Sequence, residues 1–140
     1  MECIFCKEAL RDISQMQDAL KKRNVKPVFV HMTTAEIADQ YFQNQEIQDP
    51  EHISDPNRTI YNKFGLTKGS FSQLLGLNTW VRGYKVVKSG IPYSRKTVGD
   101  SFQMPGIFML FDGKIVDSYI HKRAADRPDY NKFLDCCTSE

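Results

Sequence analysis

Two cysteines stand three residues apart at the start of the chain, Cys3 and Cys6 in the run MECIFCKEAL. The apolar residues that follow recur at spacings of three and four up to about Arg23, which predicts an amphipathic helix beginning near Ile4. Unpaired backbone N–H groups and the helix dipole stabilise a thiolate at such a place, and they lower its pKa from about 8.5. We therefore predict that Cys3 is an exposed nucleophile and that Cys6, about one turn inside, can form a reversible disulfide with it.

Length and composition indicate one ordinary globular domain that spans residues 1–140, with 41% hydrophobic and 26% charged residues. The net charge is only +2, and the 19 basic and 17 acidic residues are interspersed, so no nucleic-acid or membrane-binding surface stands out. No apolar run approaches the ~20 residues of a membrane helix, and no secretory signal pattern is present. The sequence therefore predicts a cytoplasmic protein, in which a Cys-x-x-Cys pair indicates redox catalysis or metal binding.

The elements that must position the cysteines alternate between helices and strands. After the first helix, strands are predicted at residues 25–32 and 52–54, and a β-hairpin at residues 107–111 and 115–121 around the turn Asp112–Gly113. Further helices are predicted at residues 35–43, 57–64 and 128–136, with one or two more within residues 70–89. Gly65 is expected to end the helix before it. The pattern is that of an α/β protein.

Five separated segments carry a family likeness: CIFCKEAL, SDPNRTIYNKFGL, WVRG, MPGIFMLFDGKIV and HKRAADRPDY. Taken together, they resemble the peroxiredoxin-like branch of the thioredoxin superfamily, the alkyl hydroperoxide reductase and thiol-specific antioxidant type. The resemblance covers nearly the whole chain, from Cys3 to about Phe133. It implies a thioredoxin-like fold with a central mixed sheet flanked by helices. In that fold a strand precedes the first helix, but only Met1 and Glu2 precede Cys3 here, so we expect the first strand to be missing or truncated.

The resemblance also implies roles for three residues outside the cysteine pair. Pro105 would be a cis-proline that faces the cysteines, and the cis Met104–Pro105 bond would leave the backbone groups of Met104 able to bind an extended substrate or thiol partner. Arg82 would supply a cation to a thiolate or a polarised peroxide, although an ordinary surface arginine is the alternative. A missing strand would expose strand edges, so a swapped or edge-paired homodimer is expected.

The predicted function is therefore that of a thiol-dependent oxidoreductase of peroxiredoxin-like type, which reduces peroxides or disulfides through Cys3 and Cys6. It would need no metal or organic cofactor, since its electrons would come from a thiol reductant such as a thioredoxin or glutathione system. One alternative is a catalytically inactive interaction module with the same fold. Another is a zinc site, for which the remaining candidate ligands are Cys136, Cys137, His31, His52 and His121. We interpret His31 and His121, at strand ends, as hydrogen-bonded structural residues.

Overall fold

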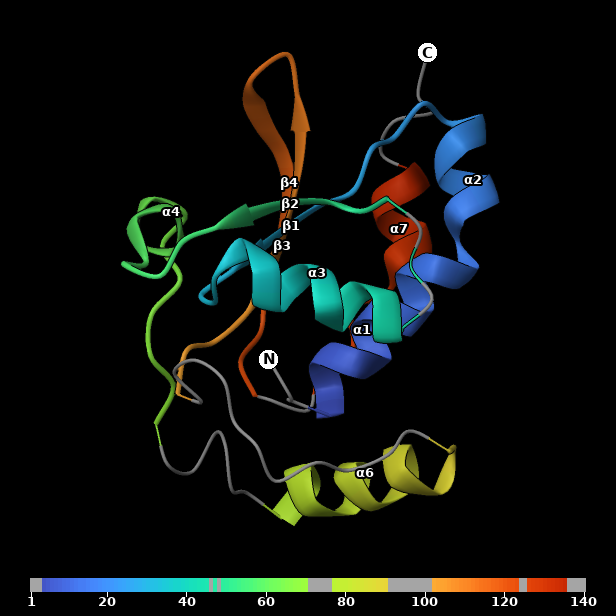
Figure 1. The fold of residues 1–140 in the computed structure, drawn as a ribbon, viewed down its shortest axis with the longest axis vertical. Helices are drawn as coiled ribbons and strands as arrows, with labels where there is room; N and C mark the ends of the chain where they lie inside the picture. Colours follow the sequence, from blue (N-terminus) through green and yellow to red (C-terminus); the bar gives the residue numbers. More distant parts are fainter. Residues whose placement is uncertain are drawn as a thin grey trace.

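The computed structural model describes residues 4–45, 47, 49–70, 77–90, 102–123 and 126–135. The elements, in chain order, are α1 (Ile4–Gln15), α2 (Gln17–Lys22), β1 (Val28–His31), α3 (Ala35–Asn44), β2 (Glu51–Ser54), α4 (Thr59–Lys63), α6 (Leu77–Lys88), β3 (Gly106–Phe111), β4 (Lys114–Ile120) and α7 (Tyr130–Asp135). The predicted order of helices and strands is confirmed, and Figure 1 shows their arrangement. No helix of the described part is long and apolar enough to cross a membrane.

The predicted first helix is interrupted at Met16, which separates α1 from α2. Two local hydrogen bonds accompany this break. The Met16 N–H donates to the Ile13 carbonyl at 3.1 Å, and the Ser14 hydroxyl donates to the Arg11 carbonyl at 2.8 Å. Three-residue hydrogen bonds tighten a helix, and a serine that bonds to its own helix backbone tends to bend it. The apolar spacing does not reveal this break, because it continues through Met16.

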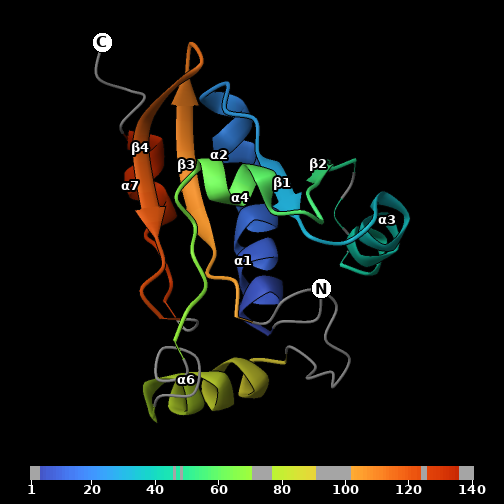
Figure 2. The same cartoon turned by 90° about the vertical axis from the view of Figure 1, so that its left-hand side faces the viewer.

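The strands form two separate two-stranded sheets. β1 and β2 are parallel, with Val28 opposite Glu51 and His31 opposite Ser54. β3 and β4 are antiparallel, and no strand in the described residues joins the two pairs. The expected central mixed sheet is thus divided into two pairs, and Figure 2 shows β3 and β4 to the left of β1 and β2. Strands pair only when they lie about 4.8 Å apart, and the described strands of the two pairs form no such ladder with each other.

The β3–β4 hairpin closes through the predicted Asp112–Gly113 turn. Both residues have positive φ, 49° for Asp112 and 72° for Gly113, as a two-residue turn of this kind requires. Gly65, with φ of 70°, ends α4 as predicted. These turns are encoded by residues that tolerate the left-handed region, so the sequence alone places them correctly.

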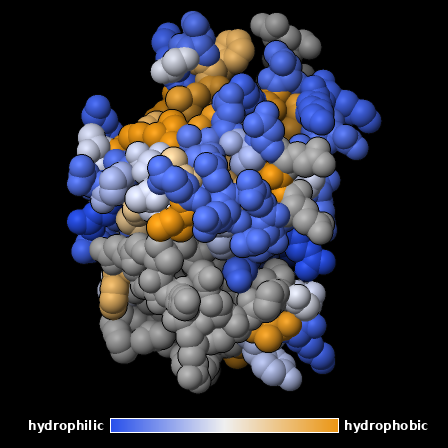
Figure 3. All heavy atoms as spheres, viewed as in Figure 1, coloured by the Kyte–Doolittle hydropathy of each residue, from blue (hydrophilic) through white to orange (hydrophobic). Residues whose placement is uncertain are grey.

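The hydrophobic core lies where α1 and α3 meet β1. Its buried members, with the half-buried Phe29 packed against them, are Leu10, Ala38, Tyr41, Phe42 and Ile47. The rings of Phe29 and Phe42 lie 5.3 Å apart. The β3–β4 hairpin contrasts with this core, because it exposes Leu110, Phe111, Ile115, Val116 and Ile120. Figure 3 shows hydrophobic surface in the upper part of the molecule, where this hairpin projects.

Candidate functional site

Cys6 is the third residue of α1 and lies in its first turn. Its side chain is half-buried. The first turn of α1 contains no acidic residue, so the unpaired N–H groups of this turn can stabilise a thiolate without an opposing carboxylate. Cys3 lies outside the described residues, and the pairing of Cys3 with Cys6 therefore stays a prediction.

Two tyrosines from different elements interact electrostatically with Cys6. Burial raises the pKa of Tyr61, in α4, to about 12, and negative charge at Cys6 and Asp55 adds to the effect. Burial likewise raises the pKa of Tyr130, in α7, to about 12, with smaller contributions that include Asp12 and Cys6. Both phenols therefore keep their protons at neutral pH. Two neutral phenols thus lie within electrostatic range of Cys6.

Asp55 fixes the position of α4 and of the tyrosine that it carries. Its buried carboxylate accepts hydrogen bonds from the backbone N–H groups of Thr59, Ile60 and Tyr61 at 2.8, 2.8 and 3.1 Å. These are N–H groups that the first turn of a helix leaves unpaired. The Tyr61 hydroxyl then donates to the Val30 carbonyl of β1 at 2.9 Å, so α4 is tied to β1 at this point.

Arg127 fixes the segment before α7 onto α1. Its guanidinium donates to both carboxylate oxygens of Asp12, at 2.9 and 2.7 Å, and lies 3.9 Å from Glu8. The hydrogen bonds to Asp12 raise the pKa of Arg127 above its ordinary value. Bidentate pairing of this kind fixes geometry as well as charge. Tyr130, three residues later, is thereby held near α1, where Asp12 has the largest charge effect on it.

Comparison with known protein families matches residues 12–123 of the chain to AhpC/TSA antioxidant enzymes. The chain belongs to this family. The predicted membership of the peroxiredoxin-like branch of the thioredoxin superfamily is thus confirmed. The matched range begins after Cys6, so it carries neither cysteine of the predicted pair. Neither a comparison with curated proteins nor one with solved structures gives a match.

The Met104–Pro105 segment differs from what the family resemblance implied. No peptide bond in the described residues is cis, so the Met104–Pro105 bond is trans and the cis expectation is wrong. Trans is also the lower-energy form of an X–Pro bond. The backbone of Met104 is already hydrogen-bonded, since its N–H donates to the Thr67 carbonyl at 3.2 Å and its carbonyl accepts from the Gln103 side chain at 3.3 Å. The Pro105 carbonyl accepts from the His121 N–H at 3.1 Å.

Arg82 lies in α6, the helix that packs near α1, but its side chain is outside the described part of the structure. The two helices are linked by Arg11 of α1, whose guanidinium donates to the Ser89 carbonyl just after α6 at 3.4 Å. Both views place α6 and the beginning of α1 in the same part of the molecule (Figures 1 and 2). The role of Arg82 near the cysteines stays a prediction.

The described residues test the zinc alternative and the structural roles predicted for His31 and His121. No group of three His, Cys, Asp or Glu side chains among them could hold a metal ion, and Cys136 and Cys137 fall outside that part of the chain. His31 is hydrogen-bonded at both ring nitrogens, as predicted for a structural residue. His121 differs, because its buried Nδ1 has no hydrogen-bond partner among the described residues.

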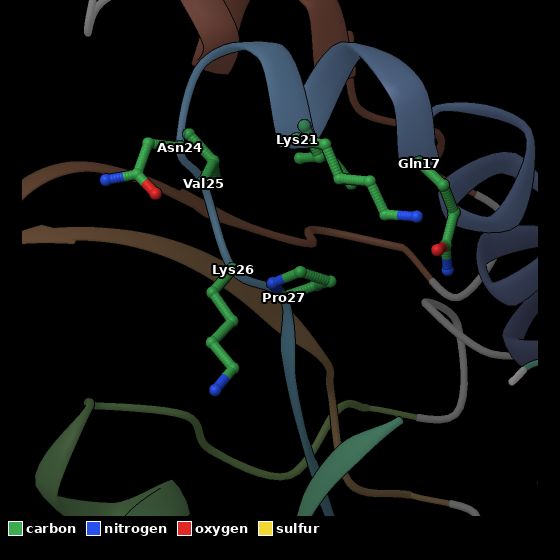
Figure 4. A pocket seen from close by; sticks show the side chains of 7 residues that line it. Gln17, Lys21, Asn24, Val25, Lys26 and Pro27 are labelled. Atoms are coloured by element: carbon green, nitrogen blue, oxygen red, sulfur yellow. The ribbon is translucent and has the colours of Figure 1, made fainter. Parts of the chain in front are cut away.

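A pocket of about 320 Å³ lies at the connection between α2 and β1. It is lined by Gln17, Leu20, Lys21, Asn24, Val25, Lys26 and Pro27. Figure 4 shows the side chains of Gln17 and Lys21 on α2, with Lys26 and Pro27 on the segment that leads to β1. None of these residues was predicted to act in the site, and none belongs to the surroundings of Cys6.

Sequence reasoning missed Tyr61, Tyr130 and Arg127 as parts of the site. Both tyrosines lie in segments that carry the family likeness, SDPNRTIYNKFGL and HKRAADRPDY. That likeness was the available signal. Helical periodicity could not supply it, because it shows which face of an element is buried and not which other element it meets.

Proposed function

We propose that the protein is a thiol-dependent oxidoreductase that reduces peroxides or disulfides through the pair Cys3 and Cys6. The observation that carries the proposal is the position of Cys6 in the first turn of α1, where its charge interacts with two phenols that keep their protons. Membership of a family of peroxiredoxin-like thiol oxidoreductases supports it. Helix N-termini favour thiolates, and a thiolate is the reactive form of cysteine.

With a peroxide as the oxidant, the Cys3 thiolate attacks the outer peroxide oxygen. The O–O bond breaks, Cys3 becomes a sulfenic acid, and the alkoxide or hydroxide leaves and takes up a proton. The Cys6 thiolate then attacks the sulfenic sulfur, so that a Cys3–Cys6 disulfide forms and water leaves. With a disulfide as the oxidant, Cys3 forms a mixed disulfide and Cys6 releases it by attack on the Cys3 sulfur. Both routes end in the same disulfide.

The tyrosines and Arg82 have supporting roles in this proposal. Tyr61 already donates to the Val30 carbonyl, so its part is to hold α4 against β1. Tyr130 keeps a hydroxyl proton with which it can stabilise a thiolate or a leaving oxygen. Arg82 provides a cation for the polarised peroxide. Met104 and Pro105 line the approach of an extended substrate, which must displace the Met104–Thr67 hydrogen bond to pair with this backbone.

The protein's partners follow from the electron balance. Each turnover oxidises two thiols, and two further thiols must restore them, supplied by a thioredoxin or glutathione system. No metal or organic cofactor takes part in either route. A swapped or edge-paired homodimer remains part of the proposal, because β1 and β3 each pair on one side only in the described structure.

The direct test is peptide mapping by mass spectrometry after peroxide treatment. Wild type should form a Cys3–Cys6 disulfide rapidly, and a dithiol should reverse it. Cys3→Ser should abolish it, whereas Cys6→Ser should trap a sulfenic acid or a mixed disulfide. The double variant Cys136→Ser/Cys137→Ser is the matched control and should react like wild type. Full peroxide or disulfide turnover in Cys3→Ser would contradict the assignment.

The second candidate is a catalytically inactive interaction module, and one observation favours it. The Met104 N–H, which the resemblance assigns to substrate binding, is paired with Thr67 within the protein itself. Unmodified or randomly oxidised thiols in the same mapping experiment would support this candidate. Equal oxidation of Cys136 and Cys6 would do so most directly, because it would show that the position of Cys6 confers no special reactivity.

A further inference from the structure

Two histidines and an aspartate form a continuous chain of polar contacts across β1, β2 and α3. His31 Nδ1 lies 3.1 Å from the Thr33 carbonyl oxygen, and His31 Nε2 lies 2.9 Å from His52 Nδ1. His52 Nε2 lies 2.8 Å from Asp39 Oδ1. The His31 residue is 1% exposed, whereas the Asp39 side chain is 57% exposed. The chain therefore runs from the interior to the solvent.

The geometry determines how many protons this chain holds. The Thr33 carbonyl can only accept, so His31 Nδ1 must carry a hydrogen. The His31–His52 contact needs one hydrogen between its two nitrogens, and the His52–Asp39 contact needs another. Two neutral imidazoles carry two hydrogens in total, but the three contacts need three. The intact chain therefore contains one extra proton.

The position of that proton follows from charge and burial. A carboxyl group ordinarily ionises at a pH well below an imidazole, about 3.9 against 6.5, and Asp39 is solvent-exposed. Burial lowers the pKa of His31, and the nearby His52 lowers it further. The positive charge therefore belongs on His52, in contact with the Asp39 carboxylate. His31 is then neutral, with its hydrogen on Nδ1, and its Nε2 accepts from His52.

Other charged groups lie on the elements packed around the pair. α3 also carries the exposed Glu36, three residues before Asp39, and β2 begins with Glu51, which is ion-paired with Lys26. Beyond β2, the Asp55 carboxylate is hydrogen-bonded to α4. From α4, the neutral Tyr61 phenol meets β1 at Val30, next to His31. Asp39 is thus the acid that contacts the histidines directly.

We propose that His31, His52 and Asp39 form a one-proton latch that fastens α3 to the β1–β2 pair. Loss of the extra proton leaves one of the three contacts without a hydrogen, with two acceptors facing each other. Gain of a further proton places an N–H on both sides of the His31–His52 contact. Either change removes one hydrogen bond, so the latch is closed only in the one-proton state.

The first experiment reads the protons directly on the full chain. Nitrogen-15 chemical shifts of the imidazole rings are followed by NMR between pH 5 and pH 8. In the closed state, His31 should show a protonated Nδ1 and a bare Nε2, and His52 should show two protonated nitrogens. A His31 ring that carries its hydrogen on Nε2 in the folded protein would overturn the proposal, because the proton count starts from Nδ1.

The second experiment separates the latch from general surface charge. Asp39→Asn removes the carboxylate that contacts His52 Nε2 and should shift the nitrogen-15 resonance of that atom. Glu36→Gln removes an acid from the same helix without touching His52 and should shift this resonance much less. Equal effects of the two variants, or no effect of Asp39→Asn, would contradict the direct contact.

The third experiment uses amide hydrogen exchange to measure how firmly α3 is held on the β1–β2 pair. In wild type, protection of the α3 and β2 amides should change with pH together with the protonation of His52. His52→Gln should remove this pH dependence, and the exposed substitution Asp39→Asn gives a second reading if His52→Gln does not fold. Exchange in α3 that follows pH identically in wild type and Asp39→Asn would overturn the proposal.

Discussion

The two strand pairs of this molecule are stabilised in opposite ways. β1 and β2 have four residues each, and contacts between distant parts of the chain hold them, such as His31 to His52 and Tyr61 to the Val30 carbonyl. β3 and β4 have six and seven residues and close through their own turn, but no residue of either strand is fully buried. The first pair therefore depends on tertiary packing and the second on local backbone chemistry.

The largest expected effect is on the free energy of unfolding, when one phenylalanine beside β1 and one in the β3–β4 hairpin are each replaced by alanine. Phe42, in the core beside β1, is 1% exposed, and Phe42→Ala should lower the free energy of unfolding by about 3–5 kcal/mol. Phe111, at the end of β3, is 72% exposed, and Phe111→Ala should change it by no more than about 0.5 kcal/mol. Urea denaturation measures both. Similar losses in the two variants would show that the hairpin is buried in solution.

The next effect tests the anchor that follows β2. Asp55→Ala removes the acceptor for three backbone N–H groups of α4 and should cost about 3 kcal/mol of unfolding free energy. Asp55→Asn retains one acceptor oxygen and should cost less. Urea denaturation again measures the series. If Asp55→Asn were as damaging as Asp55→Ala, the number of accepted hydrogen bonds would not explain the stability.

A smaller effect tests the local turn of the hairpin. Gly113→Ala places a side chain at φ of 72° and should cost about 1 kcal/mol. Gly65→Ala is the matched control, since Gly65 has φ of 70° and equally open surroundings, but it lies at the end of α4. Thermal unfolding gives the size of both losses, and amide exchange shows where they act. We expect Gly113→Ala to loosen β3 and β4 and to leave β1 and β2 protected.

The features that the sequence predicted correctly are those encoded by a few adjacent residues. Asp112 and Gly113 accept positive φ, so the hairpin turn follows from two residues. Gly65 ends α4 for the same reason. The position of Cys6 in the first turn of α1 likewise follows from the apolar pattern that begins beside it. Each of these predictions needs no knowledge of what lies across the fold.

The missed features all need two distant segments to meet. Tyr61 and Tyr130 interact electrostatically with Cys6 from elements that begin more than fifty residues further along the chain, and no local pattern specifies that interaction. The proton count at His31 and His52 likewise depends on which nitrogen faces which atom. At Met104 the family resemblance implied an available N–H, but the Thr67 carbonyl occupies it. Tertiary contacts decided all three.

The smallest expected effect is the loss of stability at low pH, to which one buried histidine in each region contributes. Burial lowers the pKa of His31, in β1, and of His121, just after β4, below the unfolded value of about 6.5. Below pH 6.5 these two sites therefore bind more protons in the unfolded chain than in the folded one. Their contribution to stability is then complete above pH 6.5 and falls as the pH drops through the folded values, by at most about 1.4 kcal/mol per pH unit for each group.

Two variants assign this acid sensitivity to the two regions. His121→Gln should flatten the decline between pH 7 and pH 5 with little loss at pH 7, because the buried Nδ1 of His121 has no partner among the described residues. His31→Gln should lower stability already at pH 7, because it breaks contacts to Thr33 and His52. Urea denaturation across this pH range measures both. If His121→Gln were the more damaging variant at pH 7, the hairpin would depend on tertiary contacts as strongly as β1 and β2 do.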